Sequence, residues 1–154
     1  NDSFIWGKNL FKDNKYFTAN KKANLIFVEN KCLSEKTSEK FPFILLTGRT
    51  RDQWHTGTKT AQVKKLMNYK ELEFVEINEK DAKKLDIKDD DLIDVSTQRG
   101  TISLKAKVTS HINEKNIFIP ISVRVINYLT NDLVDSLSKE PDYNHSAACI
   151  VKSH

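Results

Sequence analysis

The sequence predicts a mainly β protein with a few short helices, folded as a barrel or a sandwich. Three observations carry this prediction: apolar runs of strand length recur, one segment alternates strictly between apolar and polar residues, and helical patterns are brief. The 154 residues are 38% hydrophobic and 30% charged, which is enough apolar material for one buried core. No apolar run approaches the roughly 20 residues of a membrane-spanning helix, so the sequence predicts no membrane span.

Residues 1–40 differ in character from the rest of the chain. Two short pieces, 15–18 and 23–28, have extended character and are separated by turn-forming residues. Residues 30–40 are mostly polar, which predicts an exposed linker. We therefore expect 1–40 to be the tail of a preceding domain plus a linker, and 41–154 to be the main domain.

Six strand candidates follow one another in the main domain. They lie at residues 43–46, 74–77, 92–97, 101–108, 117–119 and 148–151. The clearest is the fourth, in which apolar residues from Ile102 to Val108 alternate with polar ones at the period of a half-buried strand. The first is a continuous apolar run, which predicts a strand buried on both faces. Gln98 to Gly100 predicts a hairpin turn before the fourth strand, with the glycine at positive φ.

Two short helices are predicted between these strands. Asn78 has the side chain of an N-cap residue and begins a helix that runs through Leu85. The segment from Ala61 to Met67 places its apolar residues on one stripe at helical spacing.

Charge and cysteine content limit the classes of function. The formal net charge is +4 and the isoelectric point about 9.0, which suits an anionic ligand but falls short of a nucleic-acid-binding protein. Two cysteines, Cys32 and Cys149, are too few for a disulfide framework or a cysteine-rich metal site. We expect both to be packing residues in a reducing compartment.

The remaining metal-ligating residue types also predict no metal site. His111, His145 and His154 are isolated in sequence and are expected to be solvated. Asp89 to Asp91 lacks the spaced oxygen ligands of a calcium-binding loop and predicts a solvated turn.

The segment 47–58 is the densest concentration of functional side chains. It directly follows a predicted strand, where loops carry binding residues. Gly48 permits close approach of the backbone to a phosphate, and Arg49 and Arg51 offer planar forks for pyrophosphate oxygens. Threonine hydroxyls and the flat face of Trp54 suit a heterocycle. The alternative is an ordinary polar loop whose Trp54 packs inward.

A hydrolase centre is a further alternative for the same loop. Asp52 and His55 are three residues apart, a spacing that allows them to pair, with a threonine as the nucleophile. The loop has no nucleophile elbow, so the binding interpretation is favoured.

Ordered runs along the chain resemble one family. Residues 43–49, followed by Asp52-Gln53-Trp54-His55-Thr56, begin the resemblance, and 10–28 is similar to the segment that precedes it. Further landmarks lie at 74–78, 95–96, 99–100, 127–131, 138–143 and 147–151. On these residues the chain resembles the C-terminal molybdopterin-dinucleotide-binding domain of the dimethyl-sulfoxide-reductase family, closest to nitrate reductases of the bacterial assimilatory type.

This resemblance implies a six-stranded double-psi β-barrel over residues 41–154. It further implies that the barrel closes over the pterin portions of two molybdopterin guanine dinucleotides, which hold one molybdenum or tungsten atom. Matched by position, the implied cofactor contacts are Thr47, Gly48, Arg49, Gln53, Trp54, His55, Thr56, Asn127, Tyr143 and Asn144. No catalytic or metal-ligating residue is implied within this chain. The metal ligand and the cysteines of a [4Fe-4S] cluster are expected upstream of Asn1.

The resemblance also implies a parent enzyme. We expect a cytoplasmic, bacterial molybdenum oxidoreductase of nitrate assimilation that reduces nitrate to nitrite and takes electrons from a donor protein. The other domains of that enzyme are the expected partners of this chain, and we expect no binding of nucleic acid. The isolated fragment is expected to be inactive. Because the sequence begins with Asn1 and not Met, we expect a piece of a longer polypeptide. The alternatives are a formate dehydrogenase and a stand-alone module that binds a pterin cofactor or another subunit.

The sequence departs from the family at several positions. Asp86 and Asp90 stand where the family often has glycine, and Asn144 stands where many members have lysine. Residues 121–126 are short and aliphatic, whereas family members usually have a longer stretch with aromatic residues near the substrate funnel. The difference at 121–126 weakens the assignment of nitrate as the substrate.

Overall fold

The computed structural model describes residues 14–27, 29, 35–67 and 73–153. Contacts divide the chain into two units, Asn1–Cys32 and Leu33–His154, and each is described by itself. Within the described residues, no helix combines the length and the apolar character that crossing a membrane would require.

The two pieces of extended character predicted in the first unit are not β-strands where the structure describes them. Residues 15–18 form irregular backbone and bends, residues 23–27 have no regular secondary structure, and Val28 lies outside the described residues. None of the described residues in this unit pairs in a β-ladder, and an isolated apolar run without a partner strand cannot satisfy its backbone groups in a sheet. Leu25 and Phe27 are almost fully exposed.

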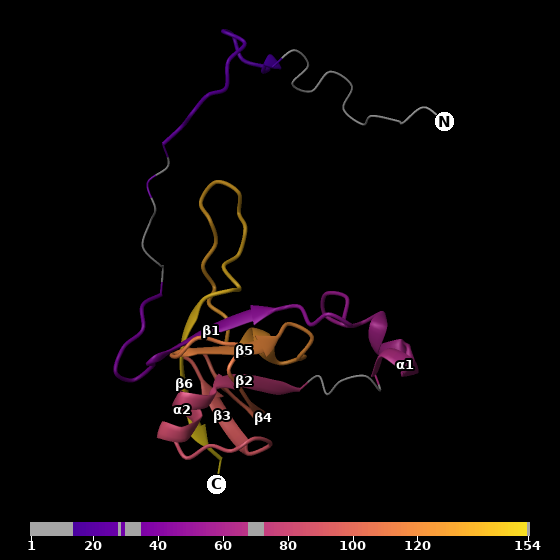
Figure 1. Cartoon of the computed structure of the whole chain (residues 1–154), viewed down its shortest axis with the longest axis vertical. Coiled ribbons are helices and arrows are strands. Elements are labelled where there is room, and N and C mark those ends of the chain that lie inside the picture. Colours follow the sequence, from indigo (N-terminus) through magenta and orange to yellow (C-terminus); the bar gives the residue numbers. More distant parts are fainter. Residues whose placement is uncertain (1–13, 28, 30–34, 68–72, 154) are drawn as a thin grey trace. The chain divides into compact units, whose positions relative to one another are not determined.

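The second unit is built around a closed barrel of six strands (Figure 1). The strands are β1 (Phe43–Gly48), β2 (Phe74–Asn78), β3 (Leu92–Ser96), β4 (Thr101–Thr109), β5 (Asn116–Pro120) and β6 (Ser146–Lys152). Around the barrel they follow the order β1-β5-β2-β4-β3-β6. Two pairs, β1 with β5 and β2 with β4, are parallel, and the other four are antiparallel. The predicted fold class, a six-stranded double-psi β-barrel with short helices, is confirmed.

Alternation along each strand fills the barrel interior. β4 shows it most clearly, because Ile102, Leu104 and Ala106 are buried while the residue before each of them is exposed. In β1 the same alternation corrects the prediction of a strand buried on both faces: Leu45 is fully buried, whereas Leu46 is half-buried. One face of β1 points into the core and the other away from it, as barrel closure requires.

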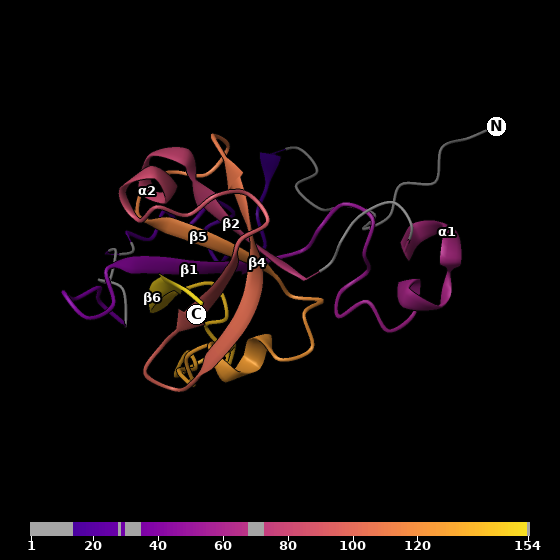
Figure 2. The same cartoon turned by 90° about the horizontal axis from the view of Figure 1, so that it is seen from below.

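The helix predicted after Asn78 is present as α2 (Glu79–Lys84), which lies against β2 (Figure 2). The Asn78 side chain accepts a hydrogen bond from the Lys80 backbone N–H at 2.9 Å, as expected of an N-cap. Asp81 is 1% exposed, and its carboxylate accepts from the backbone N–H of Lys115 at 2.6 Å. The short helix is thereby tied to the turn that precedes β5.

The helix predicted over Ala61–Met67 is interrupted. A 3-10 turn, η2 (Thr60–Gln62), and a single helical turn, α1 (Lys64–Met67), flank Val63, whose backbone is extended. Neither segment buries a residue. A short amphipathic pattern forms a continuous helix only when its apolar face is packed, and here it is not.

The hairpin turn predicted at Gln98–Gly100 is confirmed, but the reason for its glycine is different. Thr97 N–H donates to the Gly100 carbonyl at 2.9 Å, and Gly100 does not adopt positive φ. A Cβ at Gly100 would lie 3.1 Å from the backbone oxygen of Tyr128, the last residue of η3 (Ile126–Tyr128). The glycine therefore permits close packing of the hairpin on η3.

Of two residues expected to be solvated, His145 is buried and Glu35 is half-buried. His145 is 7% exposed, and its Nε2 lies 2.7 Å from the carbonyl oxygen of Glu35. The Glu35 carboxylate accepts from the backbone N–H of Ala147 at 2.9 Å. The expectation of an exposed linker is therefore wrong at Glu35, although 36–40 are exposed. The burial of these two side chains could not be predicted from their sequence neighbours, because the two contacts join segments that lie about 110 residues apart.

Candidate functional site

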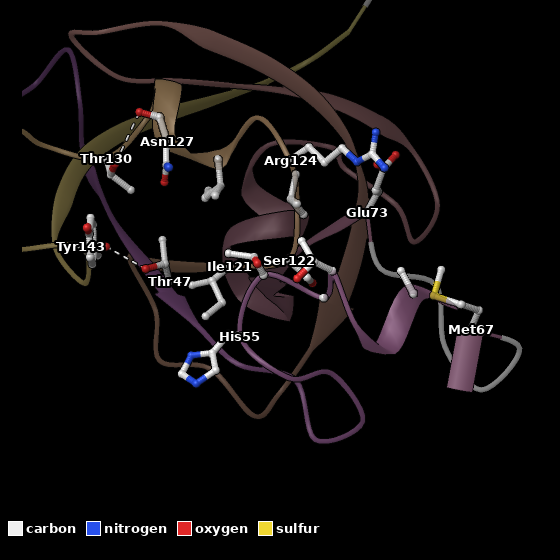
Figure 3. A pocket seen from close by; sticks show the side chains of 16 residues that line it. Thr47, His55, Met67, Glu73, Ile121, Ser122, Arg124, Asn127, Thr130 and Tyr143 are labelled. Carbon is white, nitrogen blue, oxygen red and sulfur yellow. Dashed lines mark hydrogen bonds between the residues drawn. The ribbon is translucent and has the colours of Figure 1, made fainter. Parts of the chain in front are cut away.

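The described residues enclose a pocket of about 830 Å³ at one end of the barrel. Four parts of the chain line it: the end of β1 with the loop that follows, the segment before β2, the segment from β5 through η3, and the loop that leads to β6 (Figure 3). These parts are far apart in sequence.

The parallel pairing of β1 and β5 explains how two of these segments meet. Gly48 and Pro120, the last residues of the two strands, are register partners. The Ile121 N–H then donates to the Gly48 carbonyl at 2.9 Å. Both following loops therefore start side by side at the same end of the barrel, where parallel strands place their carboxyl-terminal loops.

Of the ten cofactor contacts predicted from the sequence, the structure brings five to the pocket wall. These are Thr47, His55, Thr56, Asn127 and Tyr143. The other five, Gly48, Arg49, Gln53, Trp54 and Asn144, are not among the lining residues. The predicted loop is therefore at the pocket, and its side chains divide among the pocket wall, a buried supporting position and exposed positions.

Gln53 and Trp54 show this division. Gln53 is 3% exposed, and its side-chain oxygen accepts a hydrogen bond from the Thr60 hydroxyl. It holds the loop together from inside. Trp54 is 56% exposed and contacts the His55 ring edge to face, with centroids 4.8 Å apart, so it does not pack inward as an ordinary loop tryptophan would. Arg49 is also exposed.

Asp52 does not make the contact that the hydrolase interpretation requires. Its carboxylate accepts from the neighbouring Arg51 Nε at 3.3 Å. His55 lies against the Trp54 ring instead. The geometry favours a binding loop.

Thr47 connects the pocket wall to the C-terminal loop. Its hydroxyl donates to the Tyr143 carbonyl at 2.7 Å (Figure 3). The same hydroxyl lies 3.3 Å from the Asn144 side-chain oxygen. Asn144 does not line the pocket, but its side chain lies next to the wall residue Thr47. The hydrogen bond from Thr47 fixes the Tyr143 backbone at the pocket.

Positive φ angles shape the turn at the pocket mouth. His55 has φ +50° and Gly57 has φ +78°. A Cβ at Gly57 would lie 3.4 Å from Gln53 Oε1 and 3.5 Å from Ser122 Cβ. Gly57 therefore marks the point where this loop packs against the segment after β5.

Sequence reasoning missed several wall residues. Ser122, Arg124 and Thr130 line the pocket from the segment after β5, and Glu73 lines it from the residue before β2. The Ser122 hydroxyl is buried, with no hydrogen-bond partner among the described residues. Two signals were present in the sequence: Ser122 and Arg124 interrupt an otherwise aliphatic run, and Thr130 lies in the family landmark 127–131.

The loop after β1 also carries the excess positive charge of the chain. From Arg49 to Met67 there are five Lys and Arg residues against one Asp, an excess equal to the net charge of the entire chain. Such a segment favours anionic groups at its surface. No cluster of three or more His, Cys, Asp or Glu side chains suited to a metal occurs among the described residues. The Asp89–Asp91 turn uses its carboxylates internally, since Asp89 accepts from Val108 N–H and Asp91 from Lys88 N–H, each at 2.8 Å.

These groups fit the cofactor that the resemblance implies. A pterin ring offers amide-like donors and acceptors, which match the Asn127 amide, the Thr130 hydroxyl and the buried Ser122 hydroxyl. Phosphate oxygens match the cationic loop. The donor set at the pocket therefore suits the organic part of the cofactor and provides no metal ligand cluster.

Comparison with known proteins identifies the family. The Molydopterin dinucleotide binding domain matches residues 43–147. The F420-dependent formate dehydrogenase subunit alpha of Methanocaldococcus jannaschii is 36% identical over 148 residues, 95% of this chain and 22% of that protein. The periplasmic nitrate reductase of Desulfovibrio desulfuricans is 34% identical over 122 residues, 78% of this chain and 16% of that protein. The chain thus spans about a fifth of the length of these relatives.

A solved structure agrees on the fold. Acetylene hydratase from Pelobacter acetylenicus superimposes with a TM-score of 0.62 at 17% identity, covering 75% of this chain and 19% of that one. The family match extends over more than half of the chain and includes five of the six strands, the start of β6 and all residues that line the pocket. The chain therefore belongs to the molybdopterin dinucleotide binding domains of the dimethyl-sulfoxide-reductase family.

Proposed function

We propose that this chain is the domain of a larger oxidoreductase that binds the pterin portions of molybdopterin guanine dinucleotide. The observation that carries the proposal is the pocket itself. Three segments assigned to the cofactor from the sequence, the loop after β1, Asn127 and Tyr143, are separated by up to about 90 residues and line one cavity.

The residues of the pocket have distinct proposed roles. Asn127 and Thr130 recognise the donors and acceptors of the pterin ring, and His55 covers the ring from the loop after β1. The cationic loop attracts the phosphate groups. When bound, the cofactor supplies the electron-transfer chemistry at its metal, and this domain orients the cofactor and screens it from water.

For the reaction of the parent protein we place formate oxidation first. The formate dehydrogenase subunits of M. jannaschii and Methanococcus maripaludis align with 95% and 90% of the chain, which includes residues before the barrel. This order reverses the preference drawn from the sequence. Nitrate reduction is the second candidate, supported by the run Arg51 to Thr56 and by the alignment with a nitrate reductase over 78% of the chain.

The test uses the full-length parent protein. Purified protein is analysed for molybdenum and tungsten, for pterin by fluorescence after oxidative release, and for guanine nucleotide after hydrolysis. Its activity is then measured with formate and an oxidised dye, and with nitrate and a reduced dye. Turnover of formate alone supports the first candidate, and turnover of nitrate alone supports the second.

A matched pair of variants tests the site. Asn127→Ala removes a pocket amide, and Asn113→Ala removes an exposed amide from the turn before β5. We expect Asn127→Ala to retain pterin about tenfold more weakly, because one lost hydrogen bond with a buried ligand is worth about 1.4 kcal/mol. Asn113→Ala is expected to retain it as the unmodified protein does. Folded full-length protein that contains no pterin, or equal retention by both variants, would contradict the proposal.

A further inference from the structure

Arg99, in the hairpin between β3 and β4, is hydrogen-bonded to the segment that forms one wall of the pocket. Its Nε and Nη2 donate to the carbonyl oxygen of Leu129 at 3.2 and 3.1 Å. Leu129 is the C-cap residue of η3 and is fully buried. Asn127 and Thr130, on either side of it, line the pocket.

A single carboxylate holds the other edge of the Arg99 guanidinium. Glu35 Oε2 lies 3.0 Å from Arg99 Nη1, and Glu35 Oε1 accepts from Arg99 Nη2 at 3.3 Å. The Glu35 side chain is 10% exposed and is itself fixed by the backbone N–H of Ala147. The guanidinium plane is therefore held between a partly buried carboxylate and a buried carbonyl.

The Leu129 carbonyl needs such a partner. The last carbonyl groups of a helical turn receive no hydrogen bond from a backbone N–H of that turn. Burying such a carbonyl without a donor costs free energy. Arginine supplies two N–H groups in a rigid fork, and its charge is favourable at this end of the turn. Lysine offers one flexible ammonium and cannot bridge the carboxylate and the carbonyl with the same geometry.

The backbone of the hairpin adds a second contact. Gly100 packs so closely on η3 that a Cβ there would lie 3.1 Å from the Tyr128 carbonyl oxygen. The Thr130 hydroxyl in turn lies 3.4 Å from the Asn127 carbonyl, within the same turn. Movement of the Leu129 carbonyl would therefore displace both pocket side chains together.

We propose that Arg99, oriented by Glu35, is a positioning residue that fixes η3 so that Asn127 and Thr130 face the cofactor. This inference rests on the proposed function in one respect, the identity of the ligand. The contacts of Arg99 with Glu35 and with the Leu129 carbonyl, here called the clamp, lie within this chain and exist without the ligand. It also connects Glu35, which precedes the barrel, to the pocket wall.

The experiment uses the full-length protein with Arg99→Lys and Glu35→Gln. The control is Lys107→Met, which removes a more exposed ion pair away from η3, Lys107 with Glu76, on β4 and β2. Two quantities are measured: amide hydrogen exchange of residues 126–130 in cofactor-free protein, and the rate at which loaded protein releases pterin.

We expect Arg99→Lys to speed exchange at 126–130 and pterin release by about tenfold each, the effect of one lost charged hydrogen bond. Glu35→Gln should change both in the same direction by a smaller factor, since the two bonds to Leu129 remain. Lys107→Met should leave both rates as in the unmodified protein.

Three results would overturn the proposal or separate it from the proposed function. Unchanged exchange and release in both variants would show that the clamp does not position η3. Exchange that rises equally in all strands would show a general structural role. If the unmodified protein holds no pterin, the proposed function fails, and exchange at 126–130 alone then decides whether Arg99 holds this turn. Glu35→Gln keeps the test decisive if Arg99→Lys does not fold.

Discussion

At the scale of single residues, the loop after β1 places His55, which has a Cβ, in a backbone conformation that glycine favours. His55 occupies the left-handed region at φ +50°, where an L residue is strained relative to glycine. Its ring nonetheless lines the pocket and contacts Trp54. A strained, exposed aromatic residue at a pocket is typical of a position maintained for binding and not for stability.

Substitution of His55 separates these two roles. We expect His55→Gly to be more stable than His55→Ala by about 1 kcal/mol, because only glycine adopts positive φ without a Cβ penalty. Both variants should release pterin from the full-length protein faster than the unmodified protein does. Urea unfolding and pterin release measure the two effects, and equal stability of the variants would show that the left-handed conformation carries no strain.

At the scale of elements, α2 ends in the way expected of a helix followed by glycine, although the chain has Asp86 there. Ile87 N–H donates to the Ala82 carbonyl at 2.9 Å and Asp86 has φ +53°, which together form a Schellman motif. Ala82 and Ile87 also pack in the same core. The sequence had marked Asp86 as a departure from a family glycine, and its backbone conformation gives the reason for that glycine.

Restoring the glycine should stabilise the protein. We expect Asp86→Gly to raise the free energy of unfolding by about 0.5–1 kcal/mol, since the Cβ strain at positive φ is removed. The control is Asp86→Ala, which also removes the carboxylate but keeps a Cβ, and it should give no gain. Chemical denaturation of the three proteins measures the difference, and a gain in Asp86→Ala would assign the effect to charge.

A second contact of α2 gives the stability a pH dependence. Lys80 and Lys84 lie 2.7 and 3.2 Å from the carboxylate oxygens of Glu114, in the turn before β5. Hydrogen bonds from these two lysines hold the pKa of Glu114 below its ordinary value of 4.5. The pairing therefore stabilises the fold at neutral pH, and this contribution is lost as the pH falls below 4.5 and Glu114 becomes protonated.

Removal of the Glu114 carboxylate should make the free energy of unfolding less dependent on pH in the acid range. We expect the free energy of unfolding of Glu114→Gln to change less steeply with pH between about pH 4.5 and pH 2 than that of the unmodified chain. Salt should reduce the difference, because the groups are exposed. Urea unfolding at a series of pH values measures the slope, with Glu39→Gln, an exposed carboxylate before β1, as the control. Equal slopes for Glu114→Gln and Glu39→Gln would contradict the expectation.

At the scale of the whole molecule, barrel closure makes the strands interdependent. Every strand pairs with two neighbours, and β1 is held by β5 on one side and β6 on the other. Leu45, at the middle of β1, is fully buried in the core that all six strands share. The pocket depends on the same closure, because the loops that line it leave the barrel from β1 and β5 and enter it at β2 and β6.

A pair of leucine variants tests this dependence. We expect Leu45→Ala to lower the free energy of unfolding by about 3–4 kcal/mol, the cost of a cavity in a closed core. Leu46→Ala, one residue along and half-buried, should cost about 1 kcal/mol. Thermal and chemical unfolding measure both, and similar costs for the two variants would contradict the inward alternation of β1.

Much of the architecture could be predicted from the sequence because it is encoded locally. The alternation from Ile102 to Val108 and the cap at Asn78 each depend on residues within one element. The helix over 61–67 was predicted wrongly because its stability depends on a packing surface that the fold does not provide. The burial of Glu35 and His145 was missed for the same reason, since their partners are distant in sequence.

The sequence by itself determined the strands, the family and the loop whose residues line the pocket. It did so because side-chain periodicity, capping and motif order are properties of neighbouring residues. Only the tertiary structure decided which predicted side chains face the pocket: His55 and Asn127 line it, whereas Gln53 turns inward to support the loop. It also joined Arg99 to the pocket wall. These outcomes follow from barrel closure and parallel pairing, which bring residues tens of positions apart within hydrogen-bond distance.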